Sequence, residues 1–190
     1  MSLELYIGPM FAGKSSSIIS ILRRNAFIHR PTLCITNSLD RRYTLEAKVV
    51  SHDMDTYPAT AVSTLLPLLE SPQFHAAKCI IIDEAQFFTD LKEFVVTAVD
   101  IHEKDIICVG LDGDSERNPF GQIIDLVPYA DTITKLKAFC TQCADGTHGI
   151  FSYRRAWAPQ TQINVGTNDQ YEALCRKHYL AARKLESHSK

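Results

Sequence analysis

The octapeptide Gly8-Pro9-Met10-Phe11-Ala12-Gly13-Lys14-Ser15 fits the pattern G-x-x-x-x-G-K-[ST] and lies between an apolar run and a helical pattern. Glycines allow the backbone to turn closely, so that consecutive N–H groups point at phosphate oxygens. Lys14 would neutralise the β- and γ-phosphates of a nucleotide, and the Ser15 hydroxyl would hold Mg²⁺. A glycine turn with a surface lysine is the alternative, but a strand before the loop and a helix after it are what a phosphate-binding loop requires.

The sequence around this loop predicts an α/β fold. Four short apolar runs, at residues 3–7, 31–36, 78–83 and 105–111, do not alternate polar with apolar residues. Such runs are typical of strands buried on both faces of a parallel sheet. Between the first two runs Ile18, Ile19, Leu22 and Ala26 recur at helical spacing, and residues 91–99 predict another helix. Ligands of such a sheet gather at the carboxyl ends of its strands.

A second chemical signal follows the third apolar run, which ends in Asp83-Glu84. An acid at the end of a buried strand is typical of the Walker B element, whose aspartate binds Mg²⁺. Glu84 would activate water in an ATPase, or accept the proton of an attacking hydroxyl in a kinase, and its position does not decide between them. Capping of a following helix by the acidic pair is the alternative interpretation.

Two pairs of soft metal ligands occur late in the chain. Cys140 and Cys143 form C-x-x-C, and Cys175 and His178 form C-x-x-H. Together they can complete a closed tetrahedral Zn²⁺ site that joins the ends of a long loop. Two unrelated thiol pairs, or a disulfide, are the alternatives. The other three of the six cysteines lie in apolar runs and are predicted to be core residues: Cys34, Cys79 and Cys108.

The composition of the 190-residue chain changes near residue 139. From Cys140 onward the sequence is polar and contains glycines and a proline, with no long apolar run before a final helical pattern. Such a segment buries little core by itself. Structural zinc is worth roughly 10–16 kcal/mol in small peptides, which is enough to order it. We therefore expect a nucleotide-binding domain at residues 1–139 and a zinc-binding domain at residues 140–190.

The overall composition excludes several classes of protein. With 45% hydrophobic and 22% charged residues the chain is globular. A net charge of −2 gives no electrostatic reason to expect a nucleic acid as partner. No apolar run is long enough to span a membrane, and the first residues lack a signal-peptide core. We therefore expect an intracellular, cytoplasmic protein whose thiols stay reduced.

Taken in order, the motifs resemble the type II thymidine kinase family over most of the chain. The loop resembles that family's phosphate loop, with its Pro-Met-Phe insertion, and Asp83-Glu84-Ala85-Gln86-Phe87-Phe88 resembles its D-E-x-Q-F-F element. Leu111-Asp112-Gly113 followed by Pro119-Phe120-Gly121 resembles another family block, and the zinc pairs have the family's order. The resemblance implies a RecA-like P-loop parallel sheet flanked by helices, with a small zinc-stapled lasso domain that covers the nucleoside.

The resemblance also implies a reaction and its machinery. The γ-phosphate of ATP would pass to the 5′-hydroxyl of thymidine, and of deoxyuridine, to supply dTTP for DNA synthesis. Glu84 matches the family's proposed general base, and Asp83 with Ser15 matches its Mg²⁺ site. Asp40-Arg41-Arg42-Tyr43 resembles the D-x-R motif, which places Asp40 and Arg42 near the reacting phosphate. The residues implied for nucleoside binding are Met10, Gln86, Phe87, Leu111, Phe120, Phe151, Ser152, Arg154, Val165, Gly166 and Tyr171.

Without the motifs, these residue types have plainer interpretations. The phenylalanines would be core residues, Asp40 and Arg42 an exposed ion pair, and Tyr171 an anchor for the last helix. Within the resemblance, Phe151-Ser152-Tyr153-Arg154 matches the lasso that reads the base through main-chain groups. Ser115 stands where the family often has an aromatic residue, which predicts a more open wall in the base pocket.

The last expectations concern the binding partners of the chain and two alternative functions. The resemblance implies ATP, Mg²⁺, structural Zn²⁺, dTTP as feedback inhibitor and a homotetramer, with neither nucleic acid nor membrane as a partner. One rival is a RecA-like ATPase module acting on nucleic acid, which would normally offer a basic surface. Another is a zinc-ribbon nucleic-acid-binding module, an interpretation that leaves the phosphate loop unexplained.

Overall fold

A six-stranded parallel sheet forms the centre of the computed structural model, which describes residues 1–39, 48–50, 56–155, 157–158 and 170–188. The strand order is β5-β2-β6-β7-β1-β8, and every neighbouring pair is parallel. The strands are β1 (Ser2–Ile7), β2 (Thr32–Asn37), β5 (Thr60–Val62), β6 (Cys79–Ile82), β7 (Asp105–Gly110) and β8 (Thr132–Lys135). All four predicted strands are confirmed, as is the α/β class.

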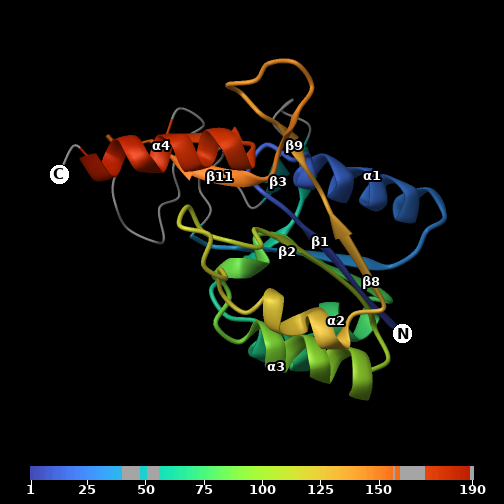
Figure 1. The fold of residues 1–190 in the computed structure, drawn as a ribbon. Helices are drawn as coiled ribbons and strands as arrows, with labels where there is room; N and C mark the ends of the chain where they lie inside the picture. The colour runs from blue at the N-terminus through green and yellow to red at the C-terminus, as the bar shows by residue number, and fades with distance from the viewer. Residues whose placement is uncertain (40–47, 51–55, 156, 159–169, 189–190) are drawn as a thin grey trace.

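Helices cover both faces of the sheet (Figure 1). Helix α1 (Lys14–Phe27) lies on one face, and α2 (Pro72–Ala76) and α3 (Leu91–Val96) lie on the other. Successive residues of a strand point to opposite faces. Accordingly, Ile81 and Ile107 pack in the cluster that contains α1, whereas Ile80 and Ile106 pack in the cluster that contains α3. Both faces are therefore apolar, which explains why the strand sequences do not alternate.

The predicted helices are found, with two differences. Ile18, Ile19 and Leu22 are buried on α1 as expected, but Ala26 is exposed. Asn25 takes the buried position instead, because its Nδ2 donates a hydrogen bond of 3.1 Å to Thr32 Oγ1. The helix predicted at residues 91–99 is α-helical to Val96 and continues as a π-helical turn, η3 (Thr97–Ile101).

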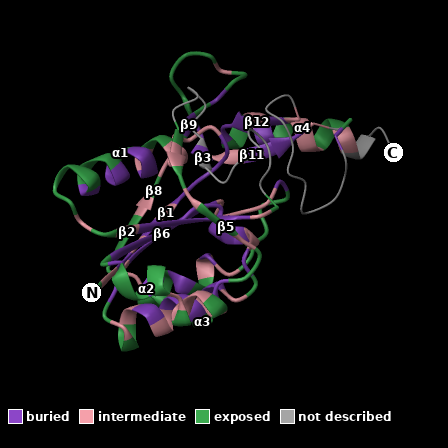
Figure 2. Ribbon diagram, turned by 180° about the vertical axis from the view of Figure 1, so that it is seen from behind, coloured by how far each residue is buried: buried purple, intermediate pink, exposed green. Residues whose placement is uncertain are grey.

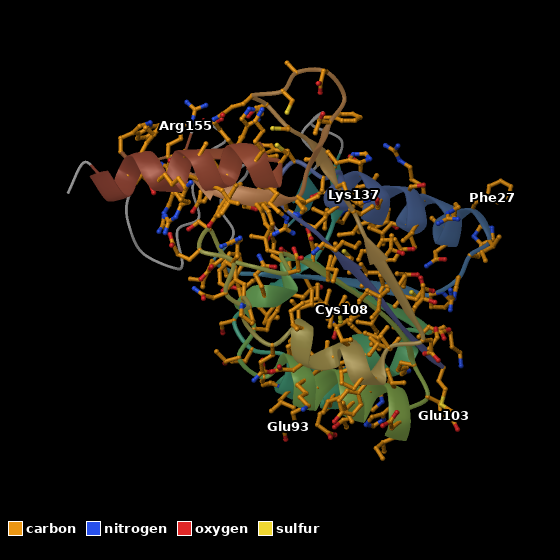
Figure 3. The ribbon with its side chains drawn as sticks, viewed as in Figure 1. Phe27, Glu93, Glu103, Cys108, Lys137 and Arg155 are labelled. Atoms are coloured by element: carbon orange, nitrogen blue, oxygen red, sulfur yellow. The ribbon has the colours of Figure 1, made fainter. Side chains whose placement is uncertain are left out.

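Cysteines from the apolar runs lie in the interior around the sheet, whereas some large apolar side chains lie on the surface. Cys34, Cys79 and Cys108 are buried at 4%, 0% and 0% exposure, which confirms them as core residues. Figure 3 shows Cys108 within the sheet, whereas Phe27 projects outward at the end of α1. Within the described residues, no helix combines the length and apolar character needed to cross a membrane.

Short elements connect and extend the sheet. They are the antiparallel pair β3 (Lys48–Val50) and β4 (Thr56–Pro58), and the turns η1 (Leu66–Glu70), η2 (Ala85–Phe87) and η4 (Ile124–Tyr129). The C-terminal elements are the antiparallel pairs β9 (Ala138–Phe139) with β10 (His148–Gly149) and β11 (Phe151–Arg154) with β12 (Tyr171–Leu174), followed by α4 (Arg176–His188).

These C-terminal elements have a small hydrophobic cluster of their own. Tyr153, Leu174 and Tyr179 are its buried members besides two cysteines. Figure 2 shows β11, β12 and α4 gathered around this buried patch, with exposed residues along the outer side of α4. The cluster is far smaller than the two that flank the sheet. A change of character near residue 139 is therefore visible in the packing, and the division into two domains stays a prediction.

Candidate functional site

The phosphate-loop sequence lies between β1 and α1, where the sheet motif requires it. Gly13 caps α1 at φ 76°, a left-handed conformation that suits glycine. Gly8 lies against the backbone of Leu136, and a Cβ there would meet the Leu136 carbonyl. The Lys14 Nζ folds back over the loop and donates to the Pro9 carbonyl at 2.7 Å. The loop therefore encloses a cationic group beside the positive end of a 14-residue helix.

Asp83 and Glu84 follow β6 and are buried, at 6% and 8% exposure. The Asp83 Oδ1 accepts the Glu84 N–H at 2.9 Å, and Glu84 has the left-handed backbone angles φ 51° and ψ 39°. A non-glycine residue in this region is uncommon and is often found at functional sites. Neither carboxylate caps an α-helix, because the following turn is the three-residue η2, whose N-cap makes no side-chain hydrogen bond. The capping alternative is therefore wrong.

Strand β7 lies between β1 and β6, so the loop and the carboxylates are separated by one intervening strand. Neighbouring strands are about 4.8 Å apart, which puts the ends of β1 and β6 roughly 10 Å from each other. That gap is large enough for a phosphoryl group and its acceptor. The parallel sheet thus brings a phosphate loop and two buried carboxylates to one edge.

Aromatic residues lie beside these carboxylates. The rings of Phe87 and Phe120 meet edge to face, with centroids 5.5 Å apart and an interplanar angle of 90°. Phe120 is buried, Phe87 is half-buried, and Phe88 lies fully in the core beneath the sheet. The plain core interpretation is therefore right for Phe88. Leu111, which begins the same loop as Phe120, is half-buried and hydrogen-bonded to Gln86.

The C-terminal elements contact the phosphate loop directly. The Met10 N–H donates to the Ser152 hydroxyl at 2.9 Å across 142 residues of sequence, and both residues are buried. Arg154 and Tyr171 are buried opposite each other in the β11–β12 ladder. The structure thus brings three regions together at one edge of the sheet: the phosphate loop, the end of β6 and strand β11.

The loop after β7 is fastened to α4. The Tyr179 hydroxyl donates to the Ser115 carbonyl at 2.8 Å in a buried contact, and Glu116 forms an ion pair with Arg183. The Arg117 guanidinium lies 4.9 Å from the Tyr179 ring centroid and 5.5 Å from that of Phe151. Ser115, expected to open this wall, is itself buried, and its carbonyl is held by α4.

Sequence reasoning missed these contacts. Tyr179 and Arg117 carry no local motif, and their partners are 64 and 34 or more residues away. Asp112, which forms a 2.5 Å ion pair with Lys135 beside β1, could have been found, since it follows the end of a parallel strand. Four residues implied by the resemblance lie outside the described residues: Asp40, Arg42, Val165 and Gly166.

The four soft ligands converge on one point. One donor atom from each of Cys140, Cys143, Cys175 and His178 lies within 4.8 Å of all the others. The His178 Nδ1 is 3.4, 3.3 and 3.6 Å from the three sulfurs in that order, and the sulfurs of Cys143 and Cys175 are 3.8 Å apart. Tetrahedral zinc requires about 3.6 Å between nitrogen and sulfur and about 3.8 Å between two sulfurs. The donor set therefore fits zinc, and all six cysteines are free of disulfides.

The cluster perturbs its own thiols. Although burial opposes ionisation of Cys140, hydrogen bonds from the Cys175 backbone and the His178 side chain lower its pKa to about 6. Desolvation and the adjacent sulfurs of Cys140 and Cys175 raise the pKa of Cys143 to about 11. Adjacent sulfurs resist joint ionisation, and binding of a divalent cation would favour the deprotonated form of each ligand.

The fold and this edge define the α/β P-loop class of phosphate-binding proteins. Comparison with known proteins narrows the class. The thymidine kinase family model matches residues 1–179, and the chain belongs to the thymidine kinase family.

Relatives from plants and viruses have the same family name. A thymidine kinase of Oryza sativa subsp. japonica is 37% identical over 182 residues, covering 94% of this chain and 66% of the rice protein. Thymidine kinase a of Arabidopsis thaliana is 36% identical, with 94% and 75% covered. A thymidine kinase of Monkeypox virus is 34% identical, with 94% and 96% covered. The chain thus spans about two thirds of the rice protein and nearly the whole of the viral one.

Proposed function

We propose that this protein is a thymidine kinase, which transfers the γ-phosphate of ATP to the 5′-hydroxyl of thymidine and of deoxyuridine. Family membership supports the activity. The observation that carries the chemistry is the buried Glu84, held in a left-handed backbone conformation across one strand from the phosphate loop. A carboxylate that is shielded from water and lies one strand away from the phosphate loop is suited to accept a proton from a substrate hydroxyl.

In this proposal the residues from Gly8 to Ser15 hold the triphosphate of ATP. Lys14 turns from the Pro9 carbonyl to the β- and γ-phosphates, and with Arg42 it offsets charge on the group in transfer. Asp40, like Arg42, is proposed to lie near the reacting phosphate. Ser15 and Asp83 are the residues that would hold magnesium, which when bound would neutralise charge on the phosphates.

Glu84 is the proposed general base. It holds the 5′-hydroxyl in line with the γ-phosphorus and accepts its proton as the oxygen attacks. Glu84 as a whole residue is 8% exposed, so bulk water has little access to it. Exclusion of water matters because water competes with the nucleoside for the same phosphoryl group.

The nucleoside is proposed to lie between the end of the sheet and the lasso. Phe87 stacks on the base, supported from its edge by Phe120. Met10, Leu111 and Tyr171 line the pocket, and main-chain groups beside Ser152 read the base edge. Phe151 and Arg154 belong to the same strand, and Val165 and Gly166 are proposed to lie near the 3′-hydroxyl of the sugar.

The Cys140, Cys143, Cys175 and His178 cluster is proposed to hold structural zinc. Three thiolates and one imidazole supply all four ligands of a tetrahedral site, so no coordination position would remain for a reacting water. Zinc bound there would supply a crosslink between β9, the end of β12 and the first turn of α4. All four of these residues lie in the second of the two proposed domains, 1–139 and 140–190.

Regulation and assembly belong to the same proposal. A family enzyme of this kind would work in the cytoplasm as a homotetramer, supply dTTP for DNA synthesis, and be inhibited by dTTP as its end product. These expectations derive from the family alone.

The test is phosphate transfer from γ-labelled Mg²⁺-ATP to a panel of nucleosides, with a control that contains none. We expect thymidine and deoxyuridine to be the best acceptors and hydrolysis without nucleoside to be slow. Preference for another nucleoside would keep the kinase and change the substrate. ATP hydrolysis that is independent of nucleoside and stimulated by DNA would instead favour the RecA-like ATPase.

A further inference from the structure

Gln86 is buried beside Glu84 and is hydrogen-bonded at both ends of its amide. Its Nε2 donates to Glu84 Oε2 at 2.5 Å, and its Oε1 accepts the Leu111 N–H at 3.0 Å. Only 3% of Gln86 is exposed. The amide therefore connects the carboxylate after β6 with the backbone that follows β7.

Two glycines approach Gln86 so closely that neither could carry a side chain without overlap. A Cβ at Gly110 would overlap Gln86 Oε1, and a Cβ at Gly121 would overlap the Gln86 carbonyl oxygen. Gly110 ends β7, and Gly121 lies at the end of the loop that carries Leu111 and Phe120. The last residue of β7 and a glycine of the following loop thus pack closely against the Gln86 amide and main chain.

The amide orientation is fixed by chemistry as well as by space. The Leu111 N–H is a donor only, so it must face the amide oxygen, which turns the NH₂ group toward Glu84. A hydrogen bond to a charged acceptor is among the stronger ones, and it is stronger still away from water. Glu84 therefore has a partner that determines which way one of its oxygens points.

We propose that Gln86 is a positioning residue that orients the Glu84 carboxylate for proton transfer, and that it does not itself contact the nucleoside. This inference rests on the proposed role of Glu84. It replaces direct substrate binding by Gln86 with an indirect role, exerted through the hydrogen bond to Glu84 Oε2. It also links the base to the β7 loop that carries Leu111, so that the acceptor pocket and the base are held as one unit.

A double-mutant cycle tests the inference. Gln86→Met keeps the volume but removes both hydrogen bonds. We expect kcat to fall roughly 10- to 100-fold through misplacement of the base, with KM for ATP within about twofold of the parent. In the Glu84→Gln background the same change should alter the residual kcat by less than about twofold, since its effect acts through Glu84.

A second variant guards against loss of folding. Gln86→Glu retains an acceptor for the Leu111 N–H but places a carboxylate against Glu84, so kcat should fall although one hydrogen bond survives. Gln122→Met is the matched control, because Gln122 Oε1 likewise accepts a backbone N–H, that of Lys92 at 2.9 Å, in a contact without Glu84. The control should keep the parent kcat. Thermal unfolding of each variant checks that the loss of activity exceeds any loss of fold.

Three results would overturn the proposal. They are a parental kcat in both Gln86 variants, an equal fold-loss in the two backgrounds, or a rise in nucleoside KM at unchanged kcat, which is the mark of direct substrate binding. The cycle is measured with whichever nucleoside the panel identifies as acceptor. Failure of the thymidine assignment therefore remains distinguishable from failure of the role of Gln86.

Discussion

Buried polar side chains mark the working edge of the sheet at the scale of single residues. Asp83, Glu84, Gln86, Ser152 and Arg154 are each less than 9% exposed, although they occupy strand ends and turns. Buried polar groups are costly unless they are hydrogen-bonded, so a concentration of them indicates function. The acids were predictable because they directly follow a strand of four apolar residues. The role of Ser152 as an acceptor was not, since its partner is a main-chain N–H.

The Ser152 contact gives the first prediction. Ser152→Ala leaves the buried Met10 N–H without its acceptor, and we expect the free energy of unfolding to fall by about 1–3 kcal/mol. Ser152→Thr keeps an acceptor oxygen at the same position and is the matched comparison. Denaturant titration of the three proteins measures the effect. Equal stability of the alanine and parent proteins would mean that the hydrogen bond contributes nothing.

At the scale of elements, α4 and the loop after β7 act as one structure. They are joined by Tyr179 to Ser115, by Arg183 to Glu116, and by Arg117 over the Tyr179 ring. Strands were predictable from unbroken apolar runs, and helices from apolar residues at helical spacing. The contacts between α4 and this loop were not predictable, because every residue type has a backbone carbonyl like the one with which Ser115 accepts its hydrogen bond.

Removal of the Tyr179 hydroxyl tests the contact between α4 and the loop after β7. Tyr179→Phe deletes the donor to Ser115, and we expect a loss of roughly 0.5–1.5 kcal/mol in stability. Because the loop lines the proposed nucleoside pocket, KM for thymidine should rise roughly twofold to tenfold while KM for ATP stays constant. Tyr129→Phe, at a tyrosine that is 46% exposed, serves as control. Steady-state kinetics with each substrate varied in turn would show the opposite pattern if α4 served ATP binding.

At the scale of the whole molecule, the described residues form a well-packed sheet with its helices, and C-terminal elements with a much smaller core. Sequence motifs predicted the parallel sheet, as well as the convergence of the three cysteines and one histidine across 38 residues. They did not predict that the C-terminal part would touch the phosphate loop through Ser152. Contacts between segments far apart in the sequence depend on the complete fold, so local residue patterns do not predict them.

Metal content and stability should therefore be linked. We expect one zinc ion per chain, and its removal by a chelator should unfold the C-terminal elements and abolish nucleoside phosphorylation. Cys143→Ser should have the same effect. Cys108→Ala changes a cysteine of the sheet core and should keep full zinc content at some cost in stability. Metal analysis with thermal unfolding measures both, and a zinc-free protein of parental stability would exclude the structural role.

The central claim is that Glu84, a buried residue directly after β6, activates the acceptor hydroxyl with its carboxylate. The decisive measurement is kcat for thymidine phosphorylation by Glu84→Gln at saturating Mg²⁺-ATP and thymidine, with the dissociation constant for ATP measured alongside. The proposed mechanism predicts a fall of roughly 10²- to 10⁴-fold in kcat with ATP affinity unchanged. Full residual activity of the variant would contradict it and remove Glu84 as the base.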